Sequence, residues 1–119
     1  MKNDIQICTE RFTKDEEIDI CHKAIDSWGA TNQKIKCIEE MGELIQALSK
    51  SLLDNKNNVE EEIADVEIML TQLKIIYSLN DVINWRNYKL KRLRERILKH
   101  EDLNKENEYG NKFKNFNRV

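Results

Sequence analysis

The stretch VEEEIADVEIML, residues 59–70, decides how this chain folds. Three consecutive glutamates open it, and apolar residues then recur at helical intervals with Asp65 among them. An ideal helix turns about 100° per residue, so each position corresponds to a direction around the axis. With Ile63 set at zero, the main apolar sector lies between about 220° and 340°, and Ile68 and Ile75 widen it on the other side to about 120°. Glu62 falls at about 260° and Asp65 at about 200°, both inside this arc. Both acidic side chains therefore lie with the apolar residues rather than across from them.

An ionised carboxylate in such surroundings is costly unless something compensates its charge. The compensation can be a proton, a basic side chain or a bound cation. The positive end of a helix stabilises acidic residues only in the first turn, and Asp65 lies deeper than that. Residues 59–70 therefore predict an acidic site whose charge is compensated.

A second acidic set lies earlier, in the segment IEEMGELIQALSK, residues 38–50. Glu40 and Glu43 are three residues apart, so their side chains can meet over one helical turn, and Glu39 lies beside them. The turn-forming sequence DNKNN, residues 54–58, separates the two acidic segments. Two helices joined by a short turn pack antiparallel, which lets both sets face one groove. Oxygen ligands without histidine or thiolate suit Mg²⁺, with Mn²⁺ as a substitute. A solvated acidic face on the first of these helices stays open as the alternative.

The whole chain is predicted to be all-α. It has no proline and three glycines in 119 residues, fewer than sheets or glycine-rich phosphate loops need. Capping-box spacing at Thr13 and Glu16, and again at Asn58 and Glu61, marks two helix starts. The expected helices cover about residues 14–28, 31–53, 59–79 and 80–100. They predict a four-helix-bundle-like domain at 14–100, between an N-terminal extension, 1–13, and a loose polar tail, 101–119.

Two apolar stripes are expected to form the core. The stripe of the second helix consists of Ile38, Met41, Ile45, Leu48 and Leu52. That of the fourth helix consists of Val82, Ile83, Leu90, Leu93 and Ile97. A chain this short buries a modest core, so we expect an oligomer, with Tyr109, Phe113 and Phe116 of the tail available to a partner chain.

Composition excludes several classes of function. Charged residues make up 35% of the chain and the formal net charge is −2, so no nucleic-acid partner and no membrane surface is expected. Without a membrane span or a signal peptide, we expect a cytoplasmic protein. The cysteines Cys8, Cys21 and Cys37 are odd in number and form no CxxC pair, so we expect three reduced thiols.

Basic residues recur at three- and four-residue spacing in the segment INWRNYKLKRLRERILK, residues 83–99. Lys89, Arg92 and Arg96 share a face with the aromatic residues of this helix. Such a row can bind a polyphosphate, with arginine contacts bidentate. The alternative is a solvated basic surface that complements the helix dipole.

Two acidic motifs occur in order, Glu39-Glu40-x-x-Glu43 and Glu61-Glu62-x-x-Asp65. Together they resemble the paired signature of the MazG-like nucleotide pyrophosphohydrolases, which belong to the all-α NTP pyrophosphohydrolase superfamily. The segments CIEEMGELIQALSK and EEEIADVEIMLTQLKII look like the two motif helices of that family, at a spacing the family allows. The resemblance spans about residues 20–98.

The resemblance implies a helical homodimer or homotetramer that hydrolyses a nucleoside triphosphate to a monophosphate and pyrophosphate. The substrates of the family are often deoxy or noncanonical nucleotides. The Mg²⁺ ligands of the family match Glu40, Glu43, Glu62 and Asp65. Its later phosphate contacts match Asn87, Lys89 and Arg92, and its contacts to base or sugar match Gln33 and Trp28.

The chemistry needs a positioned water and cations on the developing charge of the phosphate. A glutamate that is not fully engaged with metal, Glu39 or Glu43, can accept the proton of that water. Two alternatives remain open, a non-catalytic nucleotide-binding regulator and a helical interaction module whose acidic residues pair with Lys89, Arg92 and Arg96.

Overall fold

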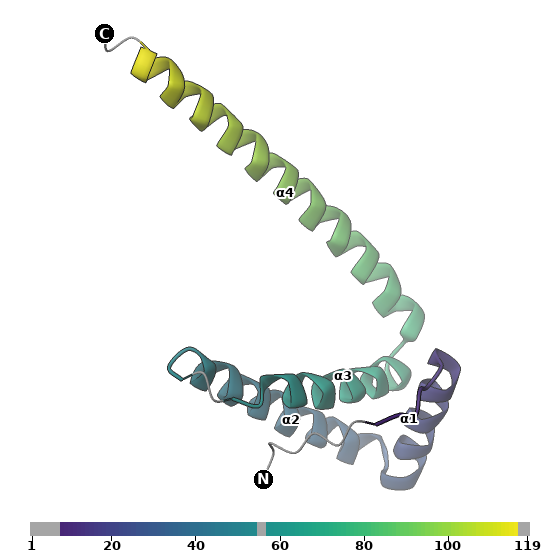
Figure 1. The fold of residues 1–119 in the computed structure, drawn as a ribbon. Helices are drawn as coiled ribbons and strands as arrows, with labels where there is room; N and C mark the ends of the chain where they lie inside the picture. Colours follow the sequence, from purple (N-terminus) through teal and green to yellow (C-terminus); the bar gives the residue numbers. More distant parts are fainter. Residues whose placement is uncertain (1–7, 55–56, 117–119) are drawn as a thin grey trace. The chain divides into compact units, whose positions relative to one another are not determined.

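The computed structural model describes residues 8–54 and 57–116, with side chains as far as residue 110. Throughout that part of the chain the regular structure is four helices without a strand, which confirms the expected all-α class (Figure 1). The chain divides into an N-terminal unit, residues 1–78, and a C-terminal unit, residues 79–119. The predicted arrangement of the four helices as a bundle stays a prediction.

Helix α1, Lys14–Trp28, begins with the predicted capping box. The Glu16 amide donates to Thr13 Oγ1 at 3.1 Å, and the Thr13 amide donates to Glu16 Oε1 at 3.2 Å. These bonds satisfy two backbone donors that would otherwise lack partners at the helix start. Gly29 ends the helix with φ at +86°, a conformation that residues with a Cβ rarely adopt, so this glycine lets the chain turn directly into α2.

Helix α2, Ala30–Ser51, and helix α3, Val59–Ile76, form the predicted hairpin. The predicted capping role of Asn58 is wrong, because its side chain makes no cap hydrogen bond and donates instead to Glu62 Oε1 at 2.7 Å. Asn57 Oδ1 accepts from the Val59 amide at 3.2 Å in its place. Helix α3 also ends three residues before the expected Leu79.

The N-terminal unit consists of the α2–α3 hairpin with α1 packed against both helices (Figure 1). Cys21 Sγ of α1 lies 3.9 Å from the Ile68 carbonyl oxygen of α3, and Lys34 Nζ lies 4.6 Å from the centre of the Tyr77 ring. The buried apolar side chains are few and mostly small: Cys21, Cys37, Ala47, Val66 and Met69. Such a core stabilises the unit only modestly.

The cysteines agree with the expectation of reduced thiols. Cys8 is exposed, and Cys21 and Cys37 are buried and free. Burial raises the pKa of both buried thiols, and the charge of Glu17 adds to the effect at Cys21. Both buried cysteines are therefore packing residues in the protonated, unreactive form.

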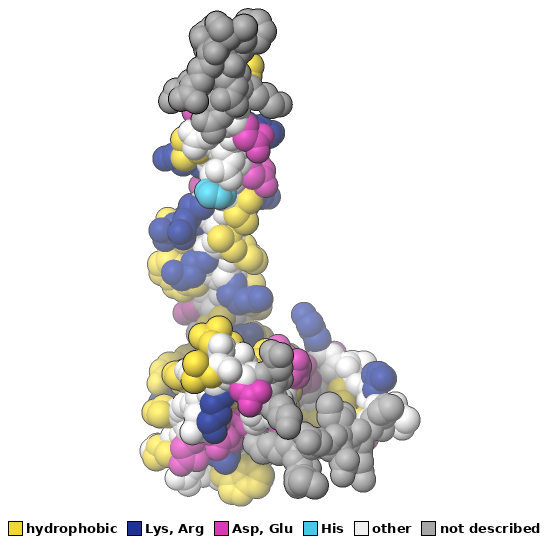
Figure 2. All heavy atoms as spheres, turned by 60° about the vertical axis from the view of Figure 1, so that its left-hand side comes forward, with side chains coloured by type: hydrophobic (Ala, Val, Ile, Leu, Met, Phe, Trp, Pro, Cys, Tyr) yellow, Lys and Arg dark blue, Asp and Glu magenta, His cyan; other side chains and the backbone are white. Residues whose placement is uncertain are grey.

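The predicted core stripe of α2 is largely exposed. Ile38, Ile45 and Leu52 are 65%, 66% and 83% exposed to solvent. Leu48 is also exposed, whereas Met41 is half-buried. The side of α2 that packs inward carries Gln33, Cys37, Glu40 and Ala47 instead. The prediction was wrong because a periodic apolar stripe identifies the apolar side of a helix but does not identify the surface that this side packs against. Figure 2 shows such hydrophobic side chains, in yellow, at the surface of the N-terminal unit.

Helix α4, Leu79–Phe116, makes up the described part of the C-terminal unit. The expected end near His100 was wrong, and the segment expected to be a loose tail is helical as far as Phe116. No proline interrupts residues 101–116, but Gly110 and four asparagines are poor helix formers, so neither periodicity nor propensity accounts for the continuation of this helix. Asn104 Nδ2 lies 3.1 Å from His100 Nε2, one turn away.

The expected core stripe of α4 is exposed at Ile83, Leu90, Leu93 and Ile97, while Val82 is half-buried. In Figure 2 lysine and arginine side chains, in dark blue, alternate with hydrophobic ones along this helix. Tyr109 is exposed, and the side chains of Phe113 and Phe116 lie outside the described residues. None of the described helices combines the length and the apolar character that crossing a lipid bilayer demands.

Candidate metal centre

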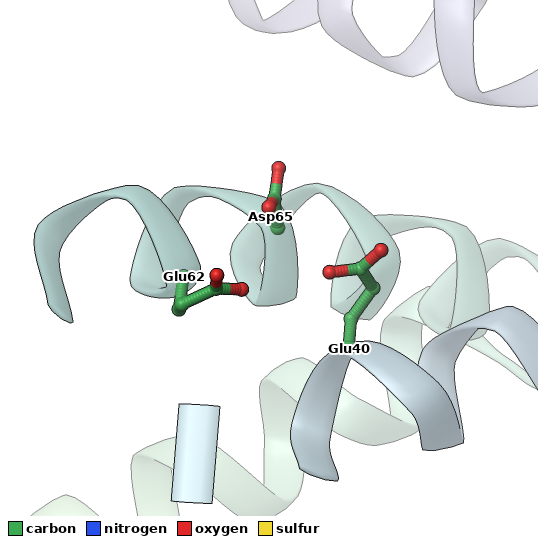
Figure 3. A group of neighbouring side chains, drawn as sticks. All are labelled: Glu40, Glu62 and Asp65. Carbon is green, nitrogen blue, oxygen red and sulfur yellow. The ribbon is translucent and has the colours of Figure 1, made fainter. Parts of the chain in front are cut away.

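Three carboxylates meet where α2 packs against α3. Glu40 comes from α2, and Glu62 and Asp65 come from α3. One carboxylate oxygen of each residue lies within 4.8 Å of one from each of the others. Figure 3 shows the carboxylate ends of Glu40 and Glu62 turned toward each other, with Asp65 beside them on α3. We call these three residues the acidic cluster.

Two members of the acidic cluster are buried. Glu62 is 2% exposed, which puts it among the most buried large side chains of the described residues, and Glu40 is 8% exposed. Asp65 is half-buried. The helical position of Glu62 within the apolar sector predicted this burial, and Glu40 borders the apolar sector of its own helix. The hairpin therefore brings together the acidic residues that the helical periodicity had marked as unusual.

One oxygen of each buried glutamate is held by a residue four positions earlier in the chain. Lys36 Nζ lies 3.2 Å from Glu40 Oε1 and 3.9 Å from Glu39 Oε2. Asn58 Nδ2 donates to Glu62 Oε1 at 2.7 Å. The hydrogen bond to Glu40, followed by the charge of Glu40, raises the pKa of Lys36. The sequence analysis missed both partners, although the i, i+4 spacing of Lys36 and Glu40 was a signal that could have found the first.

The second oxygen of Glu40, Oε2, is buried and has no hydrogen-bond partner among the described residues. A buried, unpartnered carboxylate oxygen carries a large desolvation cost. It belongs to the acidic cluster, so a cation placed among these oxygens would compensate it directly. A cluster of oxygen donors of this kind can hold a hard divalent cation.

Glu43 adjoins the acidic cluster from the next turn of α2. The charge of Glu40, and after it the charge of Glu62, raises the pKa of Glu43 above its ordinary value of 4.5. Its side chain is exposed, as are those of Glu39 and Glu61. The predicted fourth ligand therefore lies close enough to the buried acids to be repelled by their charge while remaining open to solvent.

The two residues expected to contact base or sugar lie in different surroundings. Gln33 is 7% exposed, and its Nε2 donates to Gln72 Oε1 at 2.6 Å, so its amide takes part in helix packing. Trp28 is exposed, and its carbonyl oxygen accepts from Asn32 Nδ2 at 2.8 Å. Their predicted contacts with a nucleotide remain predictions.

The predicted phosphate contacts Asn87, Lys89 and Arg92 are exposed residues of α4. Lys89 Nζ lies 5.9 Å from the centre of the Trp85 ring, and Arg92 Cζ lies 5.8 Å from that of Tyr88. These contacts confirm for Lys89 and Arg92 that the basic residues share a face with Trp85 and Tyr88. An open hollow on the same helix is lined by Asp81, Asn84, Trp85 and Tyr88.

No protein-family model, no curated protein and no solved structure matches the chain.

Proposed function

We propose that this chain is a Mg²⁺-dependent hydrolase that converts a nucleoside triphosphate into a nucleoside monophosphate and pyrophosphate. The observation that carries the proposal is the buried Glu40 Oε2, which lacks a hydrogen-bond partner among the described residues. It belongs to a carboxylate that has one oxygen within 4.8 Å of oxygens of Glu62 and Asp65. The resemblance of the two acidic motifs to those of the MazG-like pyrophosphohydrolases supplies the reaction, and a MazG-like fold is part of the proposal.

The acidic cluster would hold the metal, with Glu43 as a further ligand from the open side. Mg²⁺ in such a site lowers the pKa of a bound water and neutralises charge on phosphate oxygens. The donor set fits this ion because all four ligands are carboxylates, and Mg²⁺ prefers oxygen ligands and keeps part of its shell for water and substrate phosphates. Mn²⁺ accepts the same ligands and serves as a substitute.

The other residues of the chain would position substrate and move a proton. Glu39 and Glu43 are exposed at the edge of the acidic cluster, and one of them would accept the proton of the attacking water. Lys89 and Arg92 would bind the phosphates, since their cationic ends are exposed, and Asn87 would add a polar contact. Trp28 would contact the base, for which an exposed indole ring offers a stacking surface.

We further propose that the chain acts as a homodimer or homotetramer in which a second copy covers the apolar stripe of α2. Support comes from the small core of the N-terminal unit and from the exposure of Ile38, Ile45, Leu48 and Leu52 along one side of α2. Monomers rarely leave such a contiguous apolar strip in water. The same stripe repeated on a second copy gives a self-complementary surface, as a twofold dimer requires.

A substrate panel tests the proposed reaction. The purified chain is incubated with ribo- and deoxynucleoside triphosphates and Mg²⁺, and the released pyrophosphate and orthophosphate are quantified separately. Pyrophosphate release that stops on chelation of the metal would support the proposal. Release of orthophosphate alone, or no turnover of any nucleotide in the panel, would contradict it.

The second candidate is a non-catalytic helical module that binds a nucleotide or a protein. The contact between Lys36 and Glu40 favours it, because a cation of the chain already offsets part of the charge of the acidic cluster. This candidate predicts no turnover, together with a melting temperature that does not respond to Mg²⁺ if the acids serve packing alone. A metal-binding chain would instead melt at a higher temperature as Mg²⁺ is added.

A further inference from the structure

Gln33 of α2 and Gln72 of α3 form a buried polar contact outside the acidic cluster. Gln33 Nε2 donates to Gln72 Oε1 at 2.6 Å, and the two side chains are 7% and 4% exposed. Gln72 Nε2 in turn lies 3.7 Å from Met69 Sδ. A buried amide without a partner is costly, so this contact favours the one alignment of α2 and α3 in which the two glutamines face each other.

The glutamine pair is in step with the acidic cluster along the antiparallel hairpin. Glu40 follows Gln33 by seven residues and Asp65 precedes Gln72 by seven, which is about two turns on each helix. Glu43 and Glu62 stand ten residues from the two glutamines in the same directions. When the amides are opposite each other, the acidic residues of α2 therefore come opposite those of α3.

The apolar part of this interface selects an alignment only weakly. Cys37, Ala47 and Val66 are small side chains that can pack against more than one neighbour, and the large apolar residues Ile38, Ile45 and Leu48 of α2 are exposed. A slip of one helical turn would move Glu40 by about 5.4 Å along α3. The ligand oxygens of the acidic cluster lie within 4.8 Å of one another, so such a slip would take the cluster apart.

We propose that the Gln33–Gln72 amide pair positions the metal centre by fixing the alignment of α2 and α3. A single buried polar contact sets the register of helix pairs in the same way in coiled coils. The inference rests on the proposed function in one respect, namely that the acidic cluster binds a divalent cation. Each glutamine lies about two helical turns from the nearest member of the acidic cluster in its own helix, so both would act as positioning residues.

The test compares Mn²⁺ binding in the full-length chain and in the double variant Gln33→Met/Gln72→Met. Methionine keeps the volume and the flexibility of glutamine while removing both buried amides. Free Mn²⁺ is measured by electron paramagnetic resonance, and the melting temperature and helix content are measured without metal. We expect the double variant to keep its helix content and melting temperature and to bind Mn²⁺ about tenfold more weakly, as is usual when the support of metal ligands is lost.

The matched control is Cys37→Ala, a buried position on the same side of α2 between Gln33 and Glu40. Removing its sulfur lowers the melting temperature through lost packing but leaves the amide pair in place. We expect its Mn²⁺ affinity to equal that of the unmodified chain. We expect Cys37→Ala to lose stability but keep its Mn²⁺ affinity, and the double variant to lose Mn²⁺ affinity but keep its stability. This opposite pattern would distinguish positioning of the metal site from general packing.

Three results would overturn the inference. Unchanged Mn²⁺ affinity in the double variant would overturn it while leaving the proposed function intact. No Mn²⁺ binding by the unmodified chain would overturn the proposed function first and this inference with it. Loss of helix content both in the double variant and in Gln33→Asn/Gln72→Asn, which keeps the amides but shortens them, would show that the pair forms the hairpin rather than selecting its alignment.

Discussion

The two sides of α2 are reversed relative to the helices of most small helical proteins. Its buried side carries polar residues, and its exposed side carries large apolar ones. The side packed on α3 holds Gln33 and Glu40 together with small residues, whereas the opposite side exposes Ile38 and Ile45. In an ordinary amphipathic helix the large apolar residues would be the buried ones. The inner side of α2 therefore buries polar groups and small residues, and its outer side leaves large apolar side chains exposed.

Under the proposed function, the inner side of α2 would bind a metal ion and its outer side would bind a second copy of the chain. The buried acids on the inner side gain from a cation, because burial makes their mutual repulsion strong. The exposed isoleucines and leucines on the outer side gain from a second apolar surface, because each leaves its area in water. Changes on the inner side should therefore alter metal binding and activity, and changes on the outer side should alter association.

The largest effect is expected from Asp65→Asn on the inner side. The substitution removes one negative ligand while preserving shape, so we expect turnover of the triphosphate to fall by about 100-fold or more. Without metal, the melting temperature should stay the same or rise, because one charge leaves a repulsive cluster. Steady-state kinetics and thermal melts measure the two effects.

Glu67→Gln serves as the matched control for that substitution, because Glu67 is an exposed acid on the same helix. Its activity should remain near that of the unmodified chain. Equal loss of activity in both variants would mean that the net charge of α3, and not the acidic cluster, governs turnover. A lower melting temperature for Asp65→Asn without metal would favour a structural role for Asp65.

On the outer side, Ile45→Lys should weaken self-association. A lysine in the centre of an apolar contact would have to leave water without a partner, so we expect the dissociation constant to rise by about tenfold or more. Ile45 is 66% exposed in the single chain, so the stability of the monomer should change by less than about 0.5 kcal/mol. Light scattering across a concentration series measures the association.

The control is Gln46→Lys, which adds the same charge at the neighbouring exposed position. It should leave association unchanged. An unmodified chain that is monomeric at every concentration tested would contradict the proposed oligomer, as would an Ile45→Lys variant that associates normally.

A smaller effect is expected from Lys36→Met. Lys36 holds Glu40 Oε1 at 3.2 Å and competes with a metal ion for the negative charge of the acidic cluster. Its removal should tighten Mg²⁺ binding by about two- to fivefold, in line with the modest strength of exposed ion pairs. Calorimetric titration measures this change, with Lys50→Met as the control because Lys50 is also an exposed lysine of α2. Weaker Mg²⁺ binding in Lys36→Met would mean that Lys36 helps to build the site instead of competing for it.

The smallest effect concerns the pH dependence of stability without metal. The pKa of Glu43 is raised above 4.5 by Glu40 and Glu62, so the folded chain keeps this proton to a higher pH than the unfolded chain does. The resulting contribution to stability is present below pH 4.5 and is lost as the pH rises through the raised pKa. Glu43→Gln should therefore flatten the pH profile of the melting temperature above pH 4.5, because glutamine has no proton to lose there. Identical profiles for the two chains would contradict the repulsion.

Short-range sequence signals predicted helix boundaries correctly where the signalling side chain bonds within its own helix end. Thr13 and Glu16 formed the expected capping box. Asn58 had the same kind of spacing but serves Glu62 instead, because a neighbouring carboxylate competes with the helix start for its side chain. The continuation of α4 beyond His100 was missed because the segment after it has no apolar periodicity, and its asparagines and Gly110 do not favour a helix either.

For the candidate site, the helical direction of Glu62 predicted its burial, and the order of the two motifs predicted that Glu40 would meet Glu62 and Asp65. The contributions of Lys36 and Gln72 were not predicted. Those residues depend on how two helices align, and the apolar stripe of α2 misled the assignment of its inner side. Periodicity describes one helix at a time, whereas the alignment is a property of the pair.

The most direct test of the central claim is the anomalous diffraction of a crystal grown with Mn²⁺, recorded at the manganese absorption edge. We predict an anomalous peak bounded by the carboxylates of Glu40, Glu62 and Asp65, at metal–oxygen distances of about 2.0–2.3 Å. The same three carboxylates well ordered with no peak among them would contradict the claim that a divalent cation compensates their burial.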